Sequence, residues 1–246
     1  MRRERLSLRS PATGAHGEVI AYGHHGRPLI AFASQQGDVG DWERNGMVDA
    51  VRWLIDGGRL KVYSVSSYDS DSWFAPGVSL EEAARRHGRY EDWLVHQVVG
   101  FIHDDCGGPL DILVTGCSFG AYHAANLTLR RADLFPVAIC MSGVYDISLL
   151  APGERGDAVY FNNPVDYVAN LDGSHLQWLR EQARLLLICG QGMWEDTTGA
   201  LESTRRFAAL LAAKGLTHEA DLWGYGVAHD WPSWRAQLAH HLPRFV

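Results

Sequence analysis

The chain has 246 residues, 46% of them hydrophobic, which is enough for one sizeable core and favours a single domain spanning 1–246. Its 22 basic and 29 acidic residues give a formal net charge of −7, and this diffuse acidic balance argues against nucleic acid or an anionic membrane as a partner. No stretch reaches the roughly 18 apolar residues of a membrane-spanning helix, and no signal peptide is recognisable at the N-terminus. The four cysteines lack paired spacing, which argues against a disulfide framework or zinc and favours a cytoplasmic location.

Short apolar segments alternate with helical patterns along the chain. A leading strand is expected in 1–9, and a turn containing Thr13 and Gly14 predicts an antiparallel partner. The remaining apolar runs, interpreted as strands, are 18–22, 28–34, 60–66, 111–115, 137–142, 185–189 and 218–224. Helical patterns lie at 47–56, 80–104, 122–131 and 201–214. This alternation predicts an α/β fold with a mostly parallel central sheet of about eight strands and helices on both faces.

The least regular part of the chain is the segment 144–182, which lies between two predicted strands. It is rich in glycine and asparagine. It is a candidate small cap or substrate-side insertion, and a plain loop with two short helices fits it equally well.

The residues Gly116-Cys117-Ser118-Phe119-Gly120 match the pattern G-x-S-x-G. The pattern alone is weak, but a buried-strand run precedes it and a helical run follows it, which is the setting of a nucleophile elbow. The serine of an elbow occupies a strained turn, so the positions two residues away must be very small, as Gly116 and Gly120 are. Ser118 is therefore the candidate nucleophile. The alternative is that it only caps the following helix.

A nucleophilic serine needs a base, and in this type of site the chain order is serine, acid, histidine. His229 follows the last predicted strand on a glycine-rich loop, so it is the candidate base. Three other histidines are weaker candidates for the base. His240 and His241 fall within a terminal helix, and His123 lies on the helix after Ser118, where a packing role beneath the site is the simpler interpretation.

The acid is expected on the loop after the strand 185–189, where Glu195 and Asp196 are adjacent. Position after the strand favours Glu195 as the acid, with Asp196 as a helix cap or supporting group. Asp196 remains the alternative. An oxyanion hole requires two N–H donors. The amide of Phe119 is expected to be one, and Gln35 or Gln36, on the loop after the strand 28–34, the other.

Four tryptophans near the predicted strand ends are candidates for an aromatic substrate pocket, because open α/β sheets bind ligands at that edge. They are Trp42, Trp73, Trp194 and Trp231. Core packing is the equally weighted alternative for each of them.

Taken together, these segments resemble the putative-esterase family of the α/β-hydrolase fold, which includes esterase D-like enzymes, feruloyl esterases and mycolyltransferases. The resemblance spans nearly the whole chain and is carried by the segments 32–38, 63–69, 85–92, 116–124, 160–164 and 229–232. It implies a Ser–acid–His triad with Ser118 and His229, no metal and no organic cofactor. The chain departs from the family's pattern at Gln35-Gln36, where many relatives are rich in glycine, and at Glu195-Asp196, where relatives often have a lone Asp.

Three functions fit these residues. The first is a serine esterase that hydrolyses a small-molecule carboxylic ester, the second an acyltransferase with the same triad, and the third a non-catalytic binding module. The complete set of serine, acid and histidine favours an enzyme, and ester hydrolysis is the prediction. The physiological ester and the oligomeric state, including a homo-oligomer, are left open by the sequence.

Overall fold

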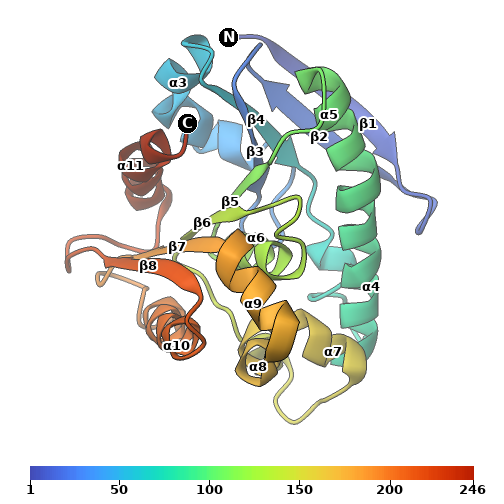
Figure 1. Cartoon of the computed structure of the whole chain (residues 1–246), viewed down its shortest axis with the longest axis vertical. Coiled ribbons are helices and arrows are strands. Elements are labelled where there is room, and N and C mark those ends of the chain that lie inside the picture. The colour runs from blue at the N-terminus through green and yellow to red at the C-terminus, as the bar shows by residue number, and fades with distance from the viewer.

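A computed structural model describes residues 1–246, and it contains one eight-stranded sheet in the order β1-β2-β4-β3-β5-β6-β7-β8 (Figure 1). The strands are β1 (Arg3–Arg9), β2 (His16–Tyr22), β3 (Arg27–Phe32), β4 (Leu60–Val65), β5 (Leu113–Cys117), β6 (Val137–Met141), β7 (Arg184–Cys189) and β8 (Thr217–Leu222). β1 and β2 pair antiparallel, as do β2 and β4, and every other pair is parallel. The predicted α/β fold, with its leading antiparallel pair, is confirmed.

Burial along the strands follows their place in the sheet. Every residue of β4, β5 and β6 is buried, because helices cover both faces of the central strands. The edge strand β1 instead alternates exposed and half-buried side chains. The predicted strands 60–66, 111–115 and 137–142 therefore lie in the interior of the sheet.

Helices cover both faces of the sheet. They are α1 (Asp41–Arg44), α2 (Met47–Ala50), α3 (Arg52–Asp56), α4 (Leu80–Trp93), α5 (Val99–Cys106), α6 (Phe119–Arg130), α7 (Asp157–Asn162), α8 (Pro164–Asn170), α9 (Gly173–Gln182), α10 (Ala200–Ala213) and α11 (Trp231–His241). A core of 23 buried residues lies under α1–α3 and α11, and a core of 34 lies under α4–α6 and α8–α10. No helix combines the length and apolar character needed to cross a membrane.

Two predicted helices differ in detail from the observed ones. The pattern at 80–104 forms α4 and α5 joined by a π-helical turn, Leu94–Val98, and Ser79 caps α4 by accepting the N–H of Glu82. The pattern at 47–56 is divided into α2 and α3 at Val51.

The segment 144–182 is more helical than expected, since it holds a 3₁₀ turn (Ile147–Leu150) and α7–α9. It is fastened to the body of the protein. The Glu81 carboxylate of α4 accepts the N–H groups of Ala158 and Val159, and the Tyr122 hydroxyl of α6 donates to the carbonyl of Asn162.

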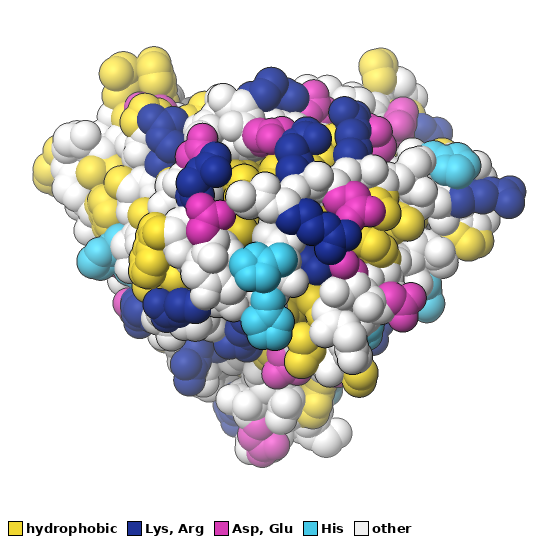
Figure 2. Space-filling view, turned by 90° about the horizontal axis from the view of Figure 1, so that it is seen from above, with side chains coloured by type: hydrophobic (Ala, Val, Ile, Leu, Met, Phe, Trp, Pro, Cys, Tyr) yellow, Lys and Arg dark blue, Asp and Glu magenta, His cyan; other side chains and the backbone are white.

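The face seen from above Figure 1, near both chain ends, mixes basic and acidic side chains (Figure 2). Ion pairs within and near the first strand, such as Arg3 with Glu43 and Arg5 with Glu18, balance the many arginines of the N-terminal segment.

Candidate active site

Ser118 occupies the sharp turn between β5 and α6, with φ of 54° and ψ of −122°. A Cβ atom at Gly116 would collide with the backbone of Gly120, and one at Gly120 would collide with the Ala33 carbonyl. Both glycines are therefore required by close packing between the turn, the helix and β3. The neighbouring Cys117 is fully buried in the core, and burial raises the pKa of its thiol far above the ordinary value.

His229 lies between Ser118 and Glu195. Its Nε2 is 3.1 Å from Oγ of Ser118, and its Nδ1 is 3.0 Å from Oε2 of Glu195. The backbone N–H of His229 donates to the Met193 carbonyl, and its ring packs nearly perpendicular to the Trp234 indole. This arrangement lets the imidazole accept the serine proton at one nitrogen while the carboxylate orients the other.

Glu195 is fully buried, and its second oxygen, Oε1, accepts hydrogen bonds from the Ser142 hydroxyl at 2.6 Å and the Gly190 N–H at 3.1 Å. Asp196 is exposed, and its carboxylate accepts only the N–H of its neighbour Thr197. It does not cap the following helix, because Gly199 occupies the N-cap position of α10. Of the two adjacent carboxylates, Glu195 is the one brought to the histidine.

The loop after β3 contributes Gln35 and Gln36. Gln36 has a left-handed backbone, and its N–H donates to Oδ2 of Asp69 at 3.2 Å. The N–H groups of Gln35 and Phe119 make no hydrogen bond within the protein, and both residues line the same cavity as Ser118. Of the two glutamines, Gln35 is therefore the one whose backbone amide is free beside Ser118.

Asp69 and His123 form a buried pair beneath this loop, with 2.8 Å between Oδ1 and Nε2. Burial alone would raise the pKa of Asp69, but the histidine and the hydrogen bonds from Ser67 and Gln36 hold the pKa below its ordinary value. The His123 ring also meets the Phe119 ring edge to face at 5.1 Å. The pair thus supports the loop and the elbow together. The sequence pattern drew attention to His123, but nothing in it paired this residue with Asp69.

The four non-glycine residues with positive φ all belong to this region. They are Gln36, Ser118, Ser142 and Trp194. Such a backbone is strained for residues with a Cβ atom and persists where the surrounding structure enforces it. Two of these residues lie next to Glu195, since Trp194 directly precedes it and Ser142 hydrogen-bonds to it.

A cavity of about 320 Å³ opens beside Ser118. Its lining is mainly apolar and consists of Gln35, Phe74, Ser118, Phe119, Val144, Asp146, Ile147, Leu149, Leu150 and Thr198. The first part of the segment 144–182 therefore forms one wall of it. No group of three or more His, Cys, Asp or Glu side chains is close enough together to hold a metal ion.

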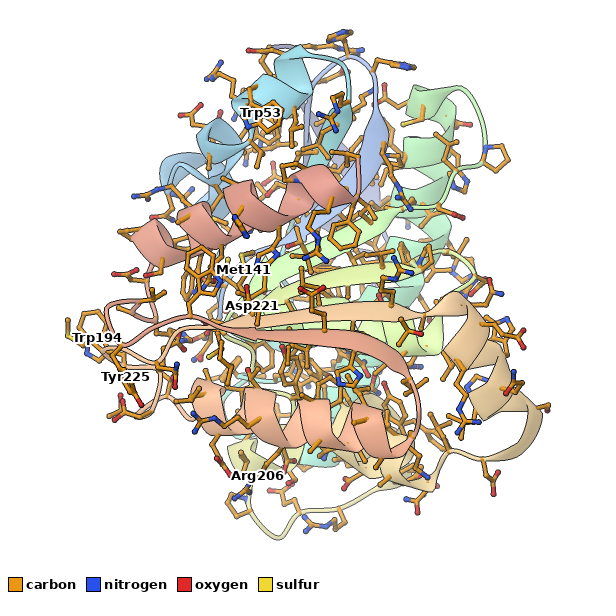
Figure 3. All side chains as sticks on the ribbon, turned by 60° about the vertical axis from the view of Figure 1, so that its left-hand side comes forward. Trp53, Met141, Trp194, Arg206, Asp221 and Tyr225 are labelled. Carbon is orange, nitrogen blue, oxygen red and sulfur yellow. The ribbon has the colours of Figure 1, made fainter.

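None of the four candidate tryptophans is among the residues that line this cavity. Trp42 is fully buried and donates its indole N–H to the Phe32 carbonyl. Trp73 is buried among aromatic rings, and Trp231 packs edge-on against Trp234. Trp194 is half exposed on the loop after β7, and Figure 3 shows it at the margin of the molecule, in the same region as Tyr225. Large apolar area drives tryptophan into the core wherever the fold offers space.

The serine lies on a strained turn at the C-terminal edge of a mostly parallel sheet. A histidine and a buried carboxylate are aligned behind it. This arrangement is typical of serine hydrolases of the α/β-hydrolase fold. The sequence model of the family described as Putative esterase matches residues 60–245. The chain belongs to this family, and it is a serine carboxylic-ester hydrolase.

Solved structures similar to the chain include a ferulic acid esterase, with 17% identity, a TM-score of 0.75, and coverage of 99% of this chain and 96% of that one. An S-formylglutathione hydrolase from Staphylococcus aureus has 18% identity, a TM-score of 0.70, and coverage of 99% and 95%. MPT51 from Mycobacterium tuberculosis has 16% identity, a TM-score of 0.67, and coverage of 99% and 97%. At these identities the likeness concerns the fold. No curated protein sequence matches the chain.

Proposed function

We propose that the protein hydrolyses small carboxylic esters through an acyl-enzyme on Ser118, with His229 as general base and acid and Glu195 as the triad acid. The observation that carries this proposal is the continuous hydrogen-bonded series from the Ser118 hydroxyl through both ring nitrogens of His229 to the buried Glu195 carboxylate.

In the first half of the reaction, Oγ of Ser118 attacks the ester carbonyl carbon as its proton passes to Nε2 of His229. The carbonyl oxygen becomes an oxyanion, which the free amides of Gln35 and Phe119 stabilise. The bond to the leaving alcohol then breaks, and the imidazolium returns its proton to that alcohol. Glu195 stabilises the imidazolium without taking up its proton.

In the second half, a water molecule gives a proton to Nε2 of His229 and attacks the acyl carbonyl. The second tetrahedral intermediate collapses, the carboxylic acid leaves, and Oγ of Ser118 regains the proton. The apolar cavity beside Ser118 is suited to a short or compact acyl group. The three fully buried cysteine thiols favour a cytoplasmic setting for this activity.

The decisive experiment is reaction with a fluorophosphonate probe, followed by location of the adduct by mass spectrometry. We expect a stoichiometric adduct on Ser118 that is lost in Ser118→Ala and strongly slowed in His229→Ala. Aryl acetate and butyrate esters, assayed with and without added alcohol and amine acceptors, then separate hydrolysis from acyl transfer. A folded protein that forms no adduct would contradict the proposal and favour a binding module.

A further inference from the structure

We infer that this active site selects neutral and cationic acyl groups over anionic ones, and that Asp146 is the residue that makes the selection. The inference rests on the proposed ester hydrolysis at Ser118 and extends it to a substrate class. Its starting point is the lining of the cavity, in which Asp146 is the one residue with a formal charge. No lysine or arginine is present there to receive a substrate carboxylate.

Asp146 is fixed in place by its neighbours. Its Oδ1 accepts the Ser148 N–H at 3.0 Å, the Ser148 hydroxyl at 2.6 Å and an amide N–H of Asn163 at 3.0 Å. Its Oδ2 makes no hydrogen bond within the protein. The carboxylate is thus held at the cavity wall with one oxygen unused, and it cannot swing away from an anionic group without breaking three hydrogen bonds.

The surroundings of the cavity reinforce the charge of Asp146. The segments that follow β3, β4, β6, β7 and β8, namely 33–40, 66–79, 142–156, 190–199 and 223–230, contain eight carboxylates and one arginine, Arg155. The carboxylates are Asp38, Asp69, Asp71, Asp146, Glu154, Glu195, Asp196 and Asp230. The whole chain has 29 acidic and 22 basic residues, so this bias belongs to the active-site edge.

Part of this negative charge is already balanced. Asp69 faces His123, and Asp38 pairs with Arg44. The unbalanced remainder includes the exposed Asp196, which lies beside the triad acid in the chain. A cleft lined by one sign of charge repels ligands of that sign and concentrates ligands of the opposite sign. Anionic acyl groups are therefore disfavoured both on approach and inside the cavity.

The test uses three esters of one aryl alcohol whose acyl groups match in length. The neutral acyl group is 5,5-dimethylhexanoyl, the cationic one is its isostere 4-(trimethylammonio)butyryl, and the anionic one is glutaryl, the half-ester. We expect wild-type kcat/KM to be about tenfold lower for the anionic ester than for the neutral one, the size expected for one partly exposed charge pair. The cationic ester should be at least as good as the neutral one.

The variant is Asp146→Asn, which preserves the side-chain size and an oxygen to accept the three hydrogen bonds. We expect the ratio of kcat/KM for the cationic ester to that for the anionic ester to fall about tenfold, since the charge alone is removed. Using the ratio within each variant cancels any general change in activity. Asp157→Asn is the matched control, because Asp157 is exposed at the start of α7, outside the cavity, and its loss changes the net charge equally. This control should leave the ratio unchanged.

A second measurement needs no variant. In wild-type protein the same ratio should shrink as ionic strength rises from about 0.01 M to 1 M, because salt screens charges that solvent reaches. Equal kcat/KM for the three esters in wild-type protein, or a ratio that neither salt nor Asp146→Asn changes, would overturn the inference while leaving ester hydrolysis intact. Failure of the protein to hydrolyse even the neutral ester would overturn the proposed function, and the inference with it.

Discussion

The hydroxyl of Ser142 donates a 2.6 Å hydrogen bond to Oε1 of Glu195, whose other oxygen faces His229. The same hydroxyl accepts the indole N–H of Trp234, so it connects Glu195 to α11, the helix that follows His229. Ser142 and Glu195 are both fully buried, so this hydrogen bond is shielded from solvent.

Ser142→Ala should therefore loosen Glu195 and lower kcat by about tenfold, the equivalent of one hydrogen bond to a charged group, with KM nearly unchanged. Steady-state kinetics on a neutral aryl ester measure this. Ser64→Ala, at a buried serine of β4 whose hydroxyl has no partner, is the control and should keep kcat. Equal kinetics for both variants would show that Ser142 does not position the acid.

The two adjacent carboxylates on the acid loop should differ sharply in importance. Glu195→Gln removes the charge that stabilises the imidazolium and should lower kcat by at least about a hundredfold. Asp196→Asn alters an exposed side chain that bonds only to Thr197, and should change kcat less than about twofold. The opposite ranking would mean that Asp196 is the triad acid.

Asp69 should position the loop after β3, which contains Gln35 and Gln36, although its carboxylate does not touch the reacting atoms. Asp69→Asn exchanges an anionic acceptor of the Gln36 N–H for a neutral one and weakens the pair with His123. We expect kcat to fall about tenfold with little change in KM, because the oxyanion exists only in the transition state.

Binding of a trifluoromethyl ketone, which forms an oxyanion on Ser118, provides an independent measurement for Asp69→Asn. Its affinity should fall in parallel with kcat. Asp71→Asn, on the same turn, is the control. If Asp69→Asn lowers thermal stability alone and leaves ketone affinity untouched, the loop does not depend on this carboxylate.

His87 should make the stability of the protein depend on pH. Burial lowers the pKa of His87, and Glu91, 3.3 Å away, only partly offsets this effect. The folded state therefore binds its proton less readily than the unfolded state, so stability is lost as the pH falls below about 6.5, by up to about 1.4 kcal/mol per pH unit. Urea unfolding at pH 7.5 and 5.5 measures the loss, and His87→Phe should reduce it. Identical pH dependence in the two proteins would contradict this assignment.

The succession of strands and helices along the chain could be predicted from the sequence, and so could Ser118 and His229 as candidate site residues. Both predictions rest on local patterns. Glycine spacing around Ser118 fixes the turn, and an apolar strand followed by a glycine-rich loop marks His229. The choice between Glu195 and Asp196 depends on where each side chain points after the left-handed Trp194, and no sequence pattern determines that backbone angle.

The contacts that support the site could not be predicted, because no local pattern links their two partners. Ser142 and Glu195 are 53 residues apart, and Asp69 and His123 are 54 apart, so only the completed sheet brings each pair together. Composition was likewise insufficient to place the tryptophans. Composition shows that apolar rings are abundant, but the space between sheet and helices decides that Trp42 is buried.

The four residues with positive φ around the site have a consequence for how the protein loses activity on denaturation. The backbone at Gln36, Ser118, Ser142 and Trp194 is kept in unfavourable conformations by the packing of surrounding elements. When that packing loosens, we expect these turns to relax before the sheet separates. Heat or denaturant should therefore inactivate the protein while its far-UV circular dichroism is still that of the native sheet and helices, and brief exposure should be reversible.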